Sequence, residues 1–133
     1  MALQFDNDRP IYIQLMEHIY GKICRSEWKP GEKLPSVRET AIEAGVNPNT
    51  VSRAYMEMER ESVVESKRGQ GTFVTEDGKV IESLKITTAE KQINAFLLAM
   101  GKIGLSKEET VELVKKQIER EKAGETQNDD AND

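Results

Sequence analysis

Short hydrogen-bonding side chains cluster at the start of one predicted helix in this 133-residue sequence. The stretch VNPNTVSRAY, residues 46–55, holds four of them, Asn47, Asn49, Thr50 and Ser52, and it adds the longer Arg53. Amides, hydroxyls and guanidinium groups hydrogen-bond to base edges and to phosphates. The free N–H groups and the positive dipole end of a helix N-terminus also favour a phosphate. The pattern therefore indicates recognition by hydrogen bonds at a helix start.

The sequence offers few residues for catalysis or metal binding. It contains one histidine, His18, and one cysteine, Cys24, so neither has a partner His or Cys for a metal site or a catalytic triad. A single cysteine also excludes an internal disulfide. A chain of this length holds one ordinary domain, or a small domain with an appendage, which argues against large catalytic folds. We expect no enzyme activity, no metal and no cofactor, and a structural role for His18 and Cys24.

The formal net charge of −5 argues at first against nucleic acid, because phosphate binding needs a basic surface. The acidity is concentrated in residues 76–133, which carry 13 acidic and 9 basic side chains. Residues 29–75 carry 7 of each, so this neutral segment can still present one basic face. The apolar stretch IYIQLMEHIY is too short and too interrupted for a signal or a membrane span. We expect a soluble cytoplasmic protein without a membrane partner.

Two predicted helices precede the polar cluster. Apolar residues at helical spacing predict a first helix over about Pro10–Arg25: Tyr12, Leu15, Met16, Ile19 and Ile23. Ser36 and Glu39 form the S-x-x-E pattern of a capping box, which starts a second helix. This helix should end at Ala44, because Gly45 suits the left-handed position that follows a helix C-terminus.

The third helix carries the polar cluster. Asn47 caps it and Pro48 occupies its first turn, although these two residues would mark a helix start in any protein. One face is apolar and predicts a core contact: Val51, Ala54, Tyr55 and Met58. The opposite face carries Asn49, Ser52, Arg53, Met56 and Arg60, whereas a fully solvated face is more usually rich in Glu and Lys. A tight glycine turn before such a helix predicts a helix-turn-helix.

A β-hairpin and two further helices are predicted after the third helix. The segment VVESKRGQGTFV predicts the hairpin, with its tip at 67–71. An apolar stripe around Ile93–Ile103 and a second capping box at Ser106 and Glu109 predict a helical hairpin. From Gly124 onward the only apolar residue is an alanine, which predicts a disordered tail.

Four blocks in this order resemble the winged helix-turn-helix domain of GntR-family transcription regulators: PIYIQL, KPGEKLPSVRE, VNPNTVSRAYMEMER and KRGQGTFV. The resemblance covers about residues 9–75, and VNPNTVSRAY is similar to the YtrA-like subfamily in particular. It implies a bacterial, sequence-specific DNA-binding repressor whose fold is mainly α with a small β-hairpin wing. Ser62 stands where a glycine is usual in that family.

The resemblance also implies the DNA contacts. The arginine of the LPSVRE block, polar positions of the third helix and the wing tip carry over to Arg38, Asn47, Asn49, Thr50, Ser52, Arg53, Arg68 and Gly69, and Lys67 is the other basic residue of the tip. The expected partner is double-stranded DNA. Trp28 and Phe73 are each isolated in the sequence, so we expect core aromatics rather than a base-stacking platform.

Too few residues follow the wing for the separate effector-binding domains of longer GntR relatives. A two-helix hairpin cannot bury its own apolar stripes, but the same hairpin of a second chain could cover them. The residues expected at this homodimer interface are Ile93, Phe96, Leu97, Met100, Val111, Val114 and Ile118. The expected organisation is a winged helix-turn-helix domain at 1–75, a helical dimerisation segment at 76–123 and a disordered tail at 124–133.

The preferred interpretation is a homodimer on a near-palindromic operator, because two recognition helices related by a two-fold axis read two half-sites. Two other functions stay open on the sequence. Winged helices also serve as protein-interaction modules, and the near-neutral middle segment would suit that use. A regulator that responds to a small-molecule effector, with a pocket between the C-terminal helices and the first helix, is also compatible with the sequence.

Overall fold

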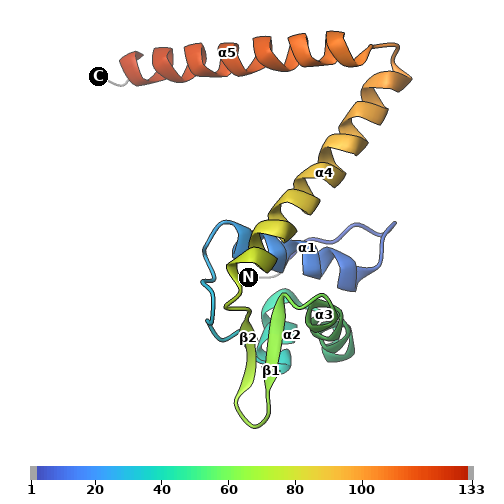
Figure 1. Ribbon diagram of the computed structural model, residues 1–133, viewed down its shortest axis with the longest axis vertical. Helices are drawn as coiled ribbons and strands as arrows, with labels where there is room; N and C mark the ends of the chain where they lie inside the picture. The colour runs from blue at the N-terminus through green and yellow to red at the C-terminus, as the bar shows by residue number, and fades with distance from the viewer. Residues whose placement is uncertain (1–2, 132–133) are drawn as a thin grey trace. The chain divides into compact units, whose positions relative to one another are not determined.

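The computed structural model describes residues 3–131, and the side chains of residues 3–124 (Figure 1). Along the chain the elements are α1 (Ile11–Cys24), α2 (Val37–Ala44), α3 (Pro48–Arg60), β1 (Val64–Lys67), β2 (Gly71–Val74), α4 (Gly78–Lys102) and α5 (Lys107–Ala131). Contacts divide the chain into two compact units, Met1–Thr87 and Thr88–Asp133. The mainly α fold with one β-hairpin confirms the fold class predicted from the sequence.

The predicted helix-turn-helix is present as α2 and α3. The Ser36 hydroxyl accepts a hydrogen bond from the backbone N–H of Glu39, and the Glu39 carboxylate accepts one from the N–H of Ser36, so the capping box starts α2. The helix ends at Ala44, as predicted, and is followed by Gly45, whose φ of 72° is left-handed and whose N–H donates to the carbonyl of Ala41. Asn47 then caps α3 directly after this turn.

The core of the first unit lies between α1, α2, α3 and the hairpin. Its buried apolar side chains are Leu15, Ile19, Ile23, Leu34, Ala41, Ala44, Val51, Ala54, Tyr55, Met58, Val63, Val64 and Val74. Phe73, which the sequence places in the core, is only half-buried. Successive residues of a strand point to opposite faces, and β2 directs Val74 inward instead. Trp28 is half-buried and packs against the core, as expected.

A third chain segment pairs with the two strands of the wing, and the sequence did not predict it. Strands β1 and β2 pair antiparallel, from Val64 opposite Val74 to Lys67 opposite Gly71. The connector before α2 adds to β2, because the N–H of Leu34 donates to the Thr72 carbonyl and the N–H of Val74 donates to the Glu32 carbonyl, both at 2.8 Å. These bonds tie the wing to the chain that leads into α2.

A left-handed residue ends α3. Ser62 has a φ of 66°, at the position where the resemblance leads one to expect glycine. This conformation costs a non-glycine residue about 1 kcal/mol. The next N–H, of Val63, donates to the Met58 carbonyl at 3.0 Å, so the strained residue closes the helix and directs the chain into β1.

The first turns of α4 belong to the first unit. Val80, Ile81 and Leu84 pack against its core, so the unit extends to Thr87, whereas the sequence places the end of the domain at Thr75. The apolar stripe predicted from the sequence begins near Ile93, so it does not include these earlier contacts with the core.

The second unit contains the rest of α4 and α5. Ser106 and Glu109 form the predicted capping box at the start of α5. Helix α5 continues to Ala131, across the segment from Gly124 that the composition predicts to be disordered. A helix needs no apolar face to continue its backbone hydrogen bonds, and Glu, Gln and Ala favour helix. The last two positions of the predicted tail, 132–133, lie outside the described residues.

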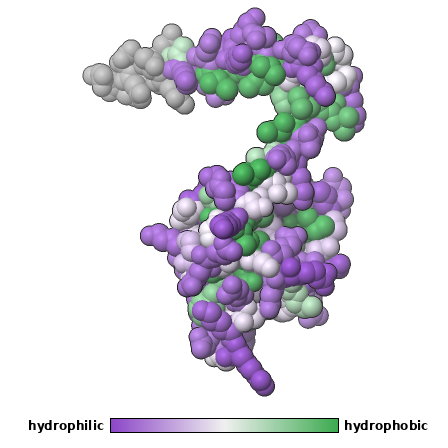
Figure 2. Space-filling model, in the orientation of Figure 1, coloured by the Kyte–Doolittle hydropathy of each residue, from purple (hydrophilic) through white to green (hydrophobic). Residues whose placement is uncertain are grey.

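Large apolar side chains of α4 and α5 are exposed (Figure 2). In the described part of the two helices the exposed ones are Ile86, Ile93, Phe96, Leu98, Val111, Leu113, Val114 and Ile118, and Ile103, directly after α4, is also exposed. Leu97 and Met100 are half-buried. The apolar stripes that the sequence predicts are therefore formed, and most of their side chains are exposed among the described residues.

Candidate nucleic-acid interface

Five side chains form one exposed side of α3, which we call the reading face: Asn49, Thr50, Ser52, Arg53 and Met56. Asn49, Arg53 and Met56 stand at i, i+4 and i+7, so they share the side of the helix opposite the buried stripe. Thr50 and Ser52 flank them and are half-buried. Met56 is 64% exposed and was not among the contacts expected from the sequence. An apolar side chain in this place suits the methyl group of thymine.

Asn47 has a structural task at the start of the reading face. Its side-chain oxygen accepts a hydrogen bond of 2.8 Å from the backbone N–H of Asn49. This bond satisfies one of the N–H groups that a helix start leaves free. Asn47 is exposed and its oxygen already accepts the capping bond, so its NH2 group is the part of the side chain that is free to donate to DNA.

Arg38 lies in the first turn of α2 and is exposed. Other arginines of the described chain are paired with carboxylates: Arg9 with Glu17 at 2.7 Å, Arg25 with Glu27 at 3.1 Å and Arg60 with Glu57 at 3.2 Å. Arg38 forms no such ion pair within residues 3–124. Its charge is therefore available to a phosphate or a base.

The wing tip is a tight turn with two basic residues. The N–H of Gln70 donates to the Lys67 carbonyl at 2.9 Å, and Gly69 adopts a φ of 75° inside this turn. Lys67 holds its Nζ 4.6 Å from the centroid of the Phe73 ring. Arg68 is exposed at the tip. Nothing lies within 4 Å of a Cβ built at Gly69, so the glycine is required by its backbone conformation and not by crowding.

Lys33 is a third basic residue at the wing, and the sequence did not identify it. Lys33 and Phe73 form an antiparallel β-bridge between the connector and β2. The Lys33 Cε lies 2.7 Å from the position that a Cβ on Gly71 would take. Lys33 is exposed. No signal in the sequence indicates that the connector pairs with β2, about 40 residues later. The position of Lys33 at the wing therefore becomes visible only in the structure.

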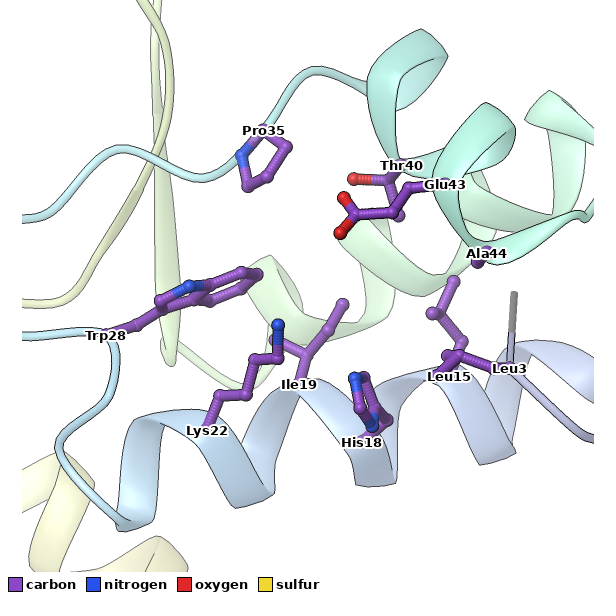
Figure 3. Close-up of a pocket in the computed structure, with 10 residues that line it drawn as sticks. All are labelled: Leu3, Leu15, His18, Ile19, Lys22, Trp28, Pro35, Thr40, Glu43 and Ala44. Atoms are coloured by element: carbon purple, nitrogen blue, oxygen red, sulfur yellow. The ribbon is translucent and has the colours of Figure 1, made fainter. Parts of the chain in front are cut away.

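A small hollow lies in the first unit between α1, the connector and α2 (Figure 3). His18 and Lys22 extend from α1 toward Glu43 of α2, and the Lys22 Nζ lies 5.0 Å from the centroid of the Trp28 ring. The volume of the hollow is about 40 Å³, whereas ligand pockets measure roughly 300–1,000 Å³. The hollow is small for an effector, and it is lined by residues 3–44, whereas the pocket considered from the sequence lies between the C-terminal helices and the first helix.

Neither His18 nor Cys24 contributes chemistry to a site. Burial, with the nearby charges of Lys22 and Arg25, lowers the pKa of His18. Burial raises the pKa of the Cys24 thiol, which keeps it protonated and unreactive. Within the described residues no cluster of three or more His, Cys, Asp or Glu side chains could hold a metal ion. Over the same residues, no helix has both the length and the apolar character to cross a membrane.

The sequence pattern of the family described as "Bacterial regulatory proteins, gntR family" matches residues 11–74. The "uncharacterized HTH-type transcriptional regulator YhcF" of Bacillus subtilis is 46% identical over 86% of this chain and 95% of its own length. The "HTH-type transcriptional repressor YtrA" of the same organism is 39% identical over 80% of this chain and 82% of its own length.

Solved structures share the fold. A GntR family transcriptional regulator from Listeria monocytogenes superposes with a TM-score of 0.79, at 39% identity, over 84% of this chain and 98% of that one. The DNA-binding domain of AraR, solved in complex with operator ORX1, superposes with a TM-score of 0.53, at 26% identity, over 56% of this chain and 95% of that one. The second of these neighbours is a complex with DNA.

Proposed function

The chain belongs to the GntR family of bacterial regulatory proteins, and we propose that it represses transcription as a homodimer bound to a near-palindromic operator. As a member of this family it is a DNA-binding transcriptional regulator and not an enzyme. The observation that carries the proposal is the reading face: a capped helix start with exposed hydrogen-bonding side chains, opposite a fully buried stripe. The proposed place of action is the bacterial cytoplasm.

In this proposal the reading face enters the major groove by the N-terminal turns of α3. Asn49, Thr50, Ser52 and Arg53 contact base edges or phosphates, and the NH2 group of Asn47 adds a donor. Arg38 binds a phosphate or a base from the start of α2. The wing residues Lys67, Arg68 and Gly69 approach the adjacent groove, where the two basic side chains attract the phosphates.

The proposed dimer interface is formed by α4 and α5. Exposed apolar side chains recur along both helices at helical spacing, which is the arrangement that a second copy can cover. The interface residues are those expected from the sequence: Ile93, Phe96, Leu97, Met100, Val111, Val114 and Ile118. A two-fold axis between copies would hold two reading faces on two half-sites, which accounts for a near-palindromic operator.

Repression is supported by the printed name of the YtrA relative, which is that of a repressor. A dimer that occupies its operator prevents other proteins from using the same stretch of DNA, so repression needs no further part of the chain. A small-molecule effector is not needed for this proposal, and the hollow beside Trp28 is too small to bind one.

The test is selection of bound fragments from random-sequence duplex DNA, followed by binding measurements at rising salt. A DNA-binding regulator should recover one near-palindromic sequence, and its affinity should fall steeply with salt because several phosphates release counterions. A winged helix that is instead a protein-interaction module should recover no sequence. In that case the proposal would be abandoned.

A further inference from the structure

An aromatic ring of α1 lies against the arginine of the reading face. The guanidinium carbon of Arg53 is 4.0 Å from the centroid of the Tyr12 ring. The Nη2 of Arg53 lies 3.4 Å from the Tyr12 hydroxyl oxygen, within reach of a long hydrogen bond. Tyr12 is half-buried and packs against the core, whereas Arg53 is exposed. The ring is thus fixed by the fold, and one side of the guanidinium rests on it.

We propose that Tyr12 and Arg53 act as one DNA-contacting unit, in which the Tyr12 ring holds the Arg53 guanidinium in place for hydrogen bonding to DNA. Tyr12 is a positioning residue, because it acts through Arg53. The inference rests on the proposed DNA-binding function, and it adds a residue of α1, a helix outside the helix-turn-helix, to the machinery of recognition.

Stacking fixes an arginine without using up its donors. A guanidinium is planar and carries its five N–H donors around its edge, while a ring attracts the cation through its face. Most of the edge of Arg53 therefore stays available for the paired acceptors of a phosphate or of a guanine. A free arginine loses rotamer freedom when it binds, and the ring removes part of that loss before DNA arrives.

The partner of Arg53 also leaves its charge intact. The paired arginines of the described chain, Arg9, Arg25 and Arg60, each lie against a carboxylate, which offsets the positive charge and accepts from the donors. Arg53 has no ion pair within residues 3–124. A neutral ring orders an arginine and, unlike a carboxylate, preserves its attraction for an anion.

The test is a double-mutant cycle on the full-length chain, with the operator recovered by selection from random-sequence DNA as the probe. Tyr12→Leu should weaken operator binding by about two- to twelvefold, which is the cost of immobilising one rotamer-rich side chain on binding. The same change made in an Arg53→Ala background should have almost no effect, since the ring then has nothing to hold. Tyr12→Phe keeps the ring and should stay within about twofold of wild type.

Tyr20→Leu is the matched control. Tyr20 is also a half-buried tyrosine of α1 that packs against the core, but its hydroxyl donates to Glu61 and it does not touch an arginine of the reading face. It should leave operator binding unchanged. Equal losses from Tyr12→Leu with and without Arg53 would overturn the inference, because the effect would then not pass through Arg53.

Failure of the Tyr12–Arg53 pairing and failure of the proposed DNA-binding function give different results. A wild-type chain that selects no DNA sequence refutes the proposed function, whereas a chain that binds its operator with additive Tyr12 and Arg53 effects overturns only the pairing. If the loss in Tyr12→Leu extends equally to random DNA, the partner of Arg53 is a phosphate, and if it is confined to the operator the partner is a guanine. Both results support the pairing.

A second measurement, by NMR, uses only the wild-type chain. In the wild-type chain the Tyr12 ring current should shift the NMR signals of the Arg53 side-chain protons upfield. Signals at the positions of a free arginine would overturn the inference.

Discussion

The hydroxyl oxygens of Thr40 in α2 and Tyr55 in α3 lie 2.7 Å apart inside the core. The Tyr55 hydroxyl also lies 2.8 Å from the carbonyl oxygen of Pro35. A carbonyl only accepts and a tyrosine hydroxyl has one proton, so Tyr55 donates to Pro35 and Thr40 donates to Tyr55. These two bonds hold the recognition helix against α2 and against the connector before it.

We predict that Tyr55→Phe lowers the free energy of unfolding by about 1–3 kcal/mol, because it leaves the Thr40 hydroxyl and the Pro35 carbonyl without this partner. Tyr20→Phe is the matched control: its hydroxyl bond to Glu61 is exposed, and water can replace the lost partner. Urea unfolding of both variants gives the comparison. If the two variants lose the same stability, the Thr40–Tyr55–Pro35 chain does not hold the two helices.

Arg38→Ala should weaken operator binding by about 1–3 kcal/mol, the usual cost of losing an arginine that contacts a base or a tightly held phosphate. The stability of the chain should not change, because Arg38 has no ion pair within the described residues. Arg25→Ala, which removes an arginine paired with Glu27, serves as the control and should bind the operator normally. Normal operator affinity in Arg38→Ala would remove this residue from the interface.

The wing should act mainly through charge. Replacing Lys67 and Arg68 together by Ala is expected to weaken binding to operator and to random DNA alike and to flatten the salt dependence, since each lost phosphate contact lowers the slope by about one. Lys33→Ala should act in the same direction with a smaller effect. A loss of sequence preference with unchanged affinity for random DNA would show instead that the tip reads bases.

His18 should make stability depend on pH. Burial lowers its pKa in the folded chain, so the unfolded chain, in which the pKa is near 6.5, binds the proton more tightly. The contribution of His18 is therefore present above about pH 6.5 and is lost as the pH falls through the folded-state pKa. The sequence has no other histidine, so urea unfolding between about pH 7.5 and 5.5 isolates this group. His18→Gln should flatten the slope, and an unchanged slope would assign it to another group.

Local signals account for what the sequence could predict. The capping box at Ser36, the glycine after α2 and the Asn-Pro pair before α3 each act within a few residues, and the structure starts and ends its helices at these signals. The buried stripe of α3 is likewise a consequence of its own periodicity. The reading face follows from that stripe, because it is the side of the helix that remains.

Contacts between distant segments account for what the sequence could not predict. The pairing of Lys33 with Phe73 and the stacking of Tyr12 on Arg53 both join residues far apart in the chain. No periodicity or cap encodes them. The packing of the first turns of α4 on the core is of the same kind, and it moves the end of the first unit to Thr87.

The exposed apolar faces of α4 and α5 are the proposed contact with a second chain. Phe96 is 41% exposed and Val114 is 37% exposed, and both lie on the apolar stripes of these helices. We predict that Phe96→Ser combined with Val114→Ser gives a folded monomer, because the core of the first unit contains neither residue. Glu90→Ser with Glu119→Ser, on exposed charged positions of the same helices, is the control and should remain dimeric.

Sedimentation of the chain with its selected operator shows how many copies bind one operator. We expect two chains on each near-palindromic operator, and a loss of roughly 10² or more in affinity for the Phe96→Ser, Val114→Ser variant, since simultaneous engagement of two half-sites is lost. One chain per operator, or a monomeric variant that binds the same operator as tightly as the wild type, would contradict the proposed homodimer.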